Sequence, residues 1–143
     1  MQENFSKAVD FTLSWEGEGG KADPGDPGGL TKWGITKRSF PDVDVANLTR
    51  EQAIDLYHKY YWQRMGCDGL ASPLDIVVFD TGVNCGPGNA LGWLQGTNSW
   101  EHVLLKRAYH YTDLARQKPY FKTILFGLMR RVCAVAALAW GAE

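Results

Sequence analysis

Two glutamates and a threonine bracket a glycine-rich stretch that holds most of the acid–base candidates in this sequence. Glu16 and Glu18 stand at its start, Asp23 and Asp26 lie within it, and Thr31 follows it. Paired carboxyl groups of this kind suit hydrolysis of a glycosidic bond. One acid protonates the leaving oxygen, and a second group opposite activates water or stabilises charge. We expect this stretch to form one side of a cleft.

Glu16 is our candidate for the acid, with Glu18 as the alternative. Apolar residues recur at helical spacing from Phe5 to Leu13, and the pattern breaks at Gly17, which predicts a first helix ending at Glu16. A carboxyl group on the last helical turn has a fixed backbone, and the adjacent Trp15 helps to exclude water. We therefore place the proton donor at the helix end.

Asp26 is the candidate second carboxylate, and Asp23 is the weaker one. Thr31 would hold the attacking water by a hydrogen bond, on the side of the sugar opposite Glu16. Sugar rings stack on aromatic faces, so we expect Trp33 and Tyr57 to line the cleft, with Trp15 and Trp62 as further candidates.

These residues also have plainer interpretations. Asp23 and Asp26 adjoin prolines and glycines as ordinary turn formers do, and Thr31 could simply belong to a strand. A calcium-binding loop is a further alternative, but two carboxylates among so many glycines offer too few oxygen ligands. We expect no metal and no cofactor.

The elements that must position these residues are mainly helical. Residues 17–34 contain seven glycines and two prolines, which exclude a regular helix there, and residues 30–36 are expected to form a short strand or hairpin arm. Thr49 and Gln52 form a capping box that begins the second helix. Ser72-Pro73-Leu74-Asp75 is expected to cap and begin a central helix that is apolar on every side.

That central helix continues into polar residues, of which Asp80 and Asn84 share a face and are candidates for substrate binding. A short helix through Trp93, a longer one capped by Ser99 and a last apolar helix complete the chain. The expected fold is a mainly α single domain that spans residues 1–143. Its class becomes α+β if the small irregular or β-containing loop segment is counted.

Composition narrows the class of protein. The chain has 143 residues and a formal net charge of -1, so nucleic acid is not an expected partner. Three cysteines without a C-x-x-C spacing argue against disulfides and zinc, and we interpret them as buried thiols. The N-terminus lacks the features of a signal peptide. Arg130-Arg131 interrupts the apolar stretch 124–140, so we expect a core helix and no membrane insertion. We also expect a monomer.

Several motifs occur in one order along residues 5–95. They are Trp15-Glu16-Gly17, Asp23-Pro-x-Asp-Pro-Gly-Gly-x-Thr-x-x-Gly-Ile35, Leu48-Thr-x-Glu-Gln-Ala53, Tyr61-Trp62 and Phe79-Asp-x-x-Val-Asn-x-Gly86. Together they resemble the phage and prophage N-acetylmuramidases of glycoside hydrolase family 108. The resemblance implies a lysozyme-like fold and cleavage of the β-1,4 bond between N-acetylmuramic acid and N-acetylglucosamine in peptidoglycan. It also implies an endolysin made in the host cytoplasm that reaches the wall through a holin-type pore.

The chain departs from this family at two places. The family's glutamate usually directly precedes Gly-Gly, which here fits Glu18. Glu16, however, lies fifteen residues before Thr31, which is the separation between the catalytic glutamate and threonine of the small phage lysozymes that this family resembles in outline. Residues 1–95 carry the catalytic motifs, and the helical part 96–143 is shorter than in many members. Two rival functions stay open: a non-catalytic peptidoglycan- or partner-binding domain, and a lytic transglycosylase.

Overall fold

The computed structural model describes residues 2–19 and 29–142; for residues 2 and 3 it describes the backbone alone. Asp23, Asp26 and the calcium-loop alternative therefore lie outside the described residues. The fold is mainly α, as expected, with one small antiparallel sheet, and it is lysozyme-like. Its longer elements are α1 (Gln2–Glu16), β1 (Thr31–Lys32), β2 (Ile35–Thr36), α2 (Arg50–Tyr57), α3 (Leu74–Cys85), α4 (Pro87–Leu94), α5 (Trp100–Gln117) and α6 (Pro119–Trp140). Three short turns of helix complete it: Val45–Asn47, the π-helical His58–Gln63 and Cys67–Gly69.

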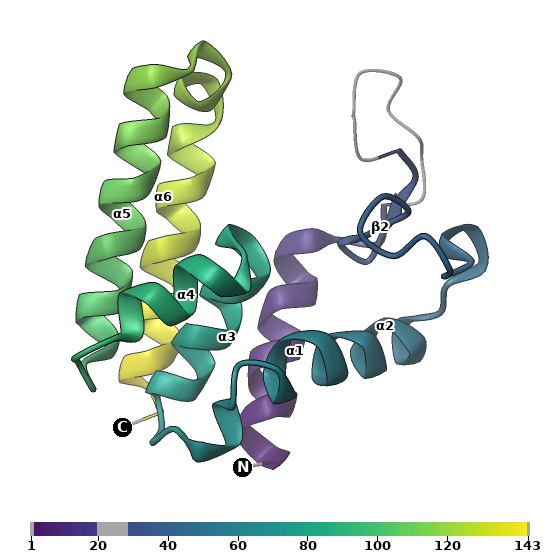
Figure 1. Ribbon diagram of the computed structural model, residues 1–143, viewed down its shortest axis with the longest axis horizontal. Coiled ribbons are helices and arrows are strands. Elements are labelled where there is room, and N and C mark those ends of the chain that lie inside the picture. The colour runs from purple at the N-terminus through teal and green to yellow at the C-terminus, as the bar shows by residue number, and fades with distance from the viewer. Residues whose placement is uncertain (1, 20–28, 143) are drawn as a thin grey trace.

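Helix α3 lies at the centre, between α1 on one side and the α5–α6 pair on the other (Figure 1). Its residues 74–82 are all buried, which fits the prediction of a helix without a polar face. Phe79 packs edge-on against Phe5 of α1, with ring centroids 5.8 Å apart, and against Trp62 at 5.6 Å. This aromatic contact fixes α1, and hence the residues at its C-terminal end, to the core.

The expected capping signals are partly confirmed. Thr49 and Gln52 form the reciprocal capping box at the start of α2, and Ser99 accepts a hydrogen bond from the backbone of His102 at the start of α5. The cap expected at Ser72 is absent, because α3 begins at Leu74 without a side-chain cap. Asp75 is buried there and accepts a hydrogen bond from the Asn4 amide at 2.9 Å, so a tertiary contact replaces the local one.

Residues 31–36, which follow the glycine-rich stretch, form the expected hairpin. Thr31 pairs with Thr36, and Lys32 pairs with Ile35. Trp33 turns the chain with a φ of +54°, a conformation that few residues other than glycine adopt, and the following Gly34 has a φ of +76°. The turn therefore depends on contacts that hold Trp33 in place.

Helices α5 and α6 run side by side, and the turn between them projects beyond α3 and α4 (Figure 1). The expectation of a core helix at the C-terminal end is only partly met. Val132, Val135 and Ala139 are buried in α6, but Phe126 and Trp140 are exposed. The expectation of buried thiols also fails at one position, because Cys133 on α6 is exposed. A helix that packs on one side only leaves the rest of its apolar surface in water.

Candidate active site

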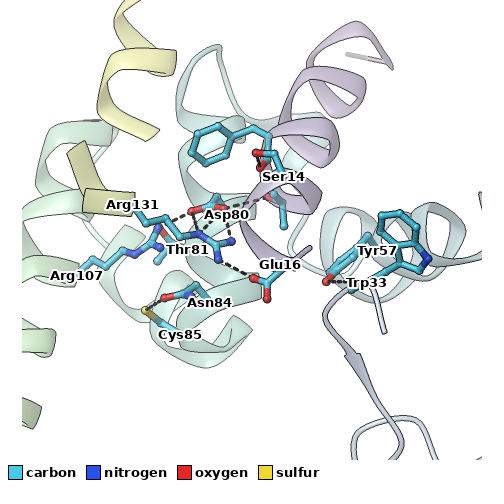
Figure 2. Close-up of polar contacts among 12 residues, drawn as sticks. Ser14, Glu16, Trp33, Tyr57, Asp80, Thr81, Asn84, Cys85, Arg107 and Arg131 are labelled. Atoms are coloured by element: carbon cyan, nitrogen blue, oxygen red, sulfur yellow. Dashed lines mark hydrogen bonds and ion pairs between the residues drawn. The ribbon is translucent and has the colours of Figure 1, made fainter. Parts of the chain in front are cut away.

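Glu16 is the last residue of α1, and Arg131 of α6 holds its side chain. The Arg131 Nη1 atom donates to Glu16 Oε1 at 2.6 Å. The Glu16 side chain retains 25% of its exposure, so solvent and ligands can reach the carboxyl group. Figure 2 shows this carboxyl between Arg131 on one side and Tyr57 and Trp33 on the other.

The turn of the β1–β2 hairpin packs directly against Glu16. A methyl group built on Gly34 would lie 2.8 Å from Glu16 Cγ and would also overlap the Tyr57 hydroxyl. That hydroxyl donates to the Trp33 carbonyl at 2.9 Å, which supports the unusual conformation of Trp33. Burial, and then the charge of Glu16, raises the pKa of Tyr57 well above its usual range, so the hydroxyl keeps its proton.

Tyr57 is therefore a support for the turn rather than an exposed cleft wall. Its side chain is 1% exposed, and its ring contacts Phe79 and Tyr61. Trp33 is half-buried beside Glu16, where we expected a sugar platform. The structure thus brings Glu16, Trp33 and Tyr57 together, although they come from three separate elements.

Asp80 does not have the expected position on a ligand-facing surface. It is fully buried, and its carboxylate accepts hydrogen bonds from Thr12 at 3.0 Å, Arg107 at 2.8 Å and Arg131 at 2.7 Å. Burial alone would raise the pKa of Asp80, but the two guanidinium groups outweigh it and hold the pKa below its usual range. Asp80 therefore anchors Arg131, and Arg131 in turn reaches Glu16.

Asn84 lies one turn beyond Asp80 on α3 and is half-buried. Its Oδ1 atom accepts a hydrogen bond from the Tyr111 hydroxyl, which itself accepts one from Arg107 Nε at 2.8 Å. The amide is thus tied to the same buried network as Asp80. Its partly exposed position leaves the expected contact with substrate a prediction.

Thr31 and Glu18 lie on the hairpin side of the site. The Thr31 hydroxyl donates to the Gly29 carbonyl over a long distance of 3.5 Å, and the residue is half-buried on β1. Glu18 is exposed, and its backbone carbonyl accepts from the Trp33 N–H at 2.9 Å. Glu18 therefore contributes its backbone to the hairpin, whereas Glu16 contributes its side chain to the site.

A hollow of about 430 Å³ lies next to this site. Residues of three segments line it: Ser39, Phe40, Pro41, Asp42, Val43, Tyr60, Tyr61, Arg64 and Pro87. Tyr61 connects the hollow to the site, because its ring lies 5.5 Å from that of Tyr57. Burial, and then the nearby charge of Glu16, raises the pKa of Tyr61. Aromatic side chains beside a cation suit an acidic sugar polymer.

Arg107 and Arg131 are the residues that the sequence interpretation missed. A charged pair at Arg130-Arg131 inside an apolar helix was visible, but it was interpreted only as a break in a possible membrane span. Its signal was a buried helical position occupied by a cation, which requires a partner elsewhere in the chain. Within residues 2–19 and 29–142, no cluster of three His, Cys, Asp or Glu side chains is arranged to hold a metal ion.

Comparisons with known proteins identify the family and agree with the fold. The model of the family described as glycosyl hydrolase 108 matches residues 9–86, which is more than half of the chain. The structure is similar to the solved structure of Brucella abortus SagA, with a TM-score of 0.80 and 24% sequence identity. The match covers 99% of this chain and 96% of that one. No protein of curated function matches the chain.

Proposed function

Because this chain belongs to the glycosyl hydrolase 108 family, and is thus a glycoside hydrolase, we propose that it hydrolyses the β-1,4 bond between N-acetylmuramic acid and N-acetylglucosamine in peptidoglycan. The observation that carries this proposal is the position of Glu16. Its carboxyl group is partly exposed at a helix end, held by Arg131 and covered on one side by a hairpin turn. Such fixed placement suits a group that must meet one particular oxygen.

In this mechanism Glu16 is the general acid. Arg131 engages Oε1, so Oε2 is the oxygen that would carry the proton to the glycosidic oxygen. The leaving sugar departs with a free hydroxyl group in place of the glycosidic bond, and positive charge develops on the ring of the other sugar. The ionised Glu16 then returns to its ion pair with Arg131.

Asp26 and Thr31 are assigned to the other face of the sugar. The Thr31 hydroxyl, whose contact with the Gly29 carbonyl is long, can also accept a hydrogen bond from the attacking water. Asp26 would accept a proton from that water or stabilise the developing charge. A water positioned in this way attacks opposite the leaving group and inverts the anomeric centre.

Mass spectrometry of the products tests the reaction. Purified peptidoglycan is digested with the protein, and the soluble fragments are analysed with and without borohydride reduction. We expect reducing N-acetylmuramic acid ends, which gain two hydrogens on reduction. Reducing N-acetylglucosamine ends would contradict the assigned bond, and anhydromuramic ends would assign the protein to the lytic transglycosylases. Absence of soluble fragments would favour a non-catalytic binding domain.

We further propose that the protein acts as an endolysin in host lysis. The support is the resemblance of its motifs to phage and prophage enzymes. Expression in a bacterial host without a holin should leave the culture turbid until the inner membrane is permeabilised, and should then cause rapid lysis. Lysis before permeabilisation would contradict release through a holin-type pore.

A further inference from the structure

The outward side of α6 carries a row of apolar side chains that are exposed or partly exposed. Phe126, Met129 and Cys133 follow one another at spacings of three and four, and Ala134 lies beside Cys133, so the four share one side of the helix. Met129 also packs in part against the core. With Arg130 they line a shallow hollow of about 540 Å³. Phe126 itself is 76% exposed.

This face makes α6 unusually apolar for its degree of burial. An 18-residue window of the helix has a mean hydropathy of 1.5, but only 22% of that window is buried inside the protein. Length and composition alone would let α6 cross a membrane. In the folded domain, however, Arg131 is paired with Asp80 and Glu16, which fixes the inner side of the helix to the core. The apolar surface is thus available on the outer side only, and contiguous patches of this kind mark contact surfaces.

Charge is distributed unequally along the chain. Residues 1–99 contain eight basic and thirteen acidic side chains, a formal charge of -5. Residues 100–143 contain seven basic and three acidic side chains, a formal charge of +4, and the two parts together give the net charge of -1. Arg107 and Arg131 are buried, so the exposed cations of the second part are Lys106, Arg116, Lys118, Lys122 and Arg130.

The cations are interleaved with aromatic rings near the far end of the α5–α6 pair. Lys118 Nζ lies 5.9 Å from the centroid of the Phe121 ring, and the Arg130 guanidinium lies 6.0 Å from that of Phe126. Tyr120, in the same turn, is 67% exposed. Aromatic rings and basic side chains beside an apolar helix face are typical of a surface that lies in a membrane interface.

We propose that the far end of the α5–α6 hairpin, residues 116–134, binds the surface of an anionic lipid bilayer. Such a bilayer offers both partners that this surface needs: phosphate groups for the cations and an apolar layer for Phe126 and Met129. A polyanionic wall polymer would supply charge without apolar surface. Antiparallel pairing with a second copy around Phe126 would bring Lys122 against Arg130, which is a like-charge contact.

This binding would hold the protein at the membrane while the rest of the domain reaches outward. The hairpin end projects beyond the other helices (Figure 1), so it can contact a flat surface without displacing them. The inference is independent of the bond that the protein cleaves, because the exposed side chains proposed to meet the bilayer are not in the proposed catalytic set. Arg131, which lies within the same range, is buried and points to the core.

Vesicle co-sedimentation tests the proposal. The intact protein is mixed with vesicles of equal parts phosphatidylglycerol and phosphatidylcholine, or of phosphatidylcholine alone, at low and high salt. We expect binding to the anionic vesicles that weakens with salt. Lys118→Glu/Lys122→Glu should lower the partition coefficient at least about 30-fold, because each lost cation costs about fivefold and the two new carboxylates are repelled by the surface. Phe126→Ser should lower it about tenfold through lost apolar burial.

The matched control reverses two cations outside the hairpin, Arg38→Glu/Lys59→Glu, which gives the same net charge. It should bind nearly as well as the unchanged protein. Circular dichroism checks that every variant is folded, and substitutions at exposed positions should not alter the spectrum. Equal loss in the control, equal binding to neutral vesicles, or no sedimentation at all would overturn the proposal. So would a dimer in size-exclusion chromatography that Phe126→Ser abolishes while vesicle binding is absent.

Discussion

Arg131 Nη1 lies 2.6 Å from Glu16 Oε1, although 115 residues separate the two along the chain. The same guanidinium donates to Asp80 on α3, so one side chain joins the C-terminal helix, the central helix and the end of α1 (Figure 2). A planar group with several donors can make both contacts at once. The position of the proposed acid thus depends on a residue far outside the glycine-rich stretch.

Replacing Arg131 by lysine should therefore impair catalysis more than folding. A single ammonium group cannot span Asp80 and Glu16 as the guanidinium does, so the Glu16 carboxyl would shift. We expect kcat on peptidoglycan to fall about 100-fold with a small change in KM, because misplacement of a catalytic group acts on the chemical step. Arg130→Lys, on the exposed side of the same helix, is the control and should keep normal kcat. Equal effects of the two substitutions would refute a positioning role.

Asp80 should make stability depend on pH. Its pKa in the folded protein lies below the usual value of about 3.9, so its contribution is fully present above that value. The contribution is lost as the pH falls through the lower pKa of the folded state. Asp80→Asn leaves the buried Arg107 without its anion and Arg131 with Glu16 as its remaining anion, and should reduce the free energy of unfolding at pH 7 by about 3–5 kcal/mol.

Urea denaturation at pH 7 and at pH 3 measures this effect. The difference between Asp80→Asn and the unchanged protein should narrow at the lower pH. Asp10→Asn removes an exposed ion pair with Arg50 and should cost less than about 1 kcal/mol. A buried pair that behaves like this surface pair would contradict our account of the network.

Gly34 should tolerate no side chain, because Tyr57 and Glu16 occupy the space beside it. Gly34→Ala is expected to displace the Glu16 side chain and to lower activity about 100-fold. Gly29→Ala is a matched control, since Gly29 has a similar φ of +73° with no heavy atom within 4 Å of the added methyl group. Adding Tyr57→Phe removes the nearest atom but leaves the overlap with Glu16 and removes the hydrogen bond to the Trp33 carbonyl, so the double variant should not regain activity. No difference between the two glycine variants would show that the contact has no role.

Much of the fold could be predicted because the relevant signals are local. The end of α1 at Glu16, the capping box at Thr49 and the cap at Ser99 each depend on a few neighbouring residues. The beginning of α3 near Leu74 was also predicted, but the absence of its cap was not, because Asp75 bonds to Asn4 across 71 residues. Local sequence patterns do not predict the structure correctly where a tertiary contact competes with the local one.

The same difference between local signals and distant contacts applies to the residues of the candidate site. Glu16 was proposed as the acid from its place at a helix end before a glycine-rich stretch. Arg131 was not, because its meaning depends on which distant carboxylates it meets. Asp80 was assigned to substrate binding since a polar residue on an apolar helix fits either a ligand or a buried ion pair, and only three-dimensional neighbours separate the two.

The most direct test compares Glu16→Gln with Glu18→Gln in a turbidity assay on purified cell walls. An amide cannot donate the required proton, so we expect Glu16→Gln to fold normally and to lose activity about 1000-fold. Glu18→Gln should stay close to the unchanged protein, because its side chain is exposed beside the site. Full activity in Glu16→Gln, with the loss in Glu18→Gln, would contradict the central assignment.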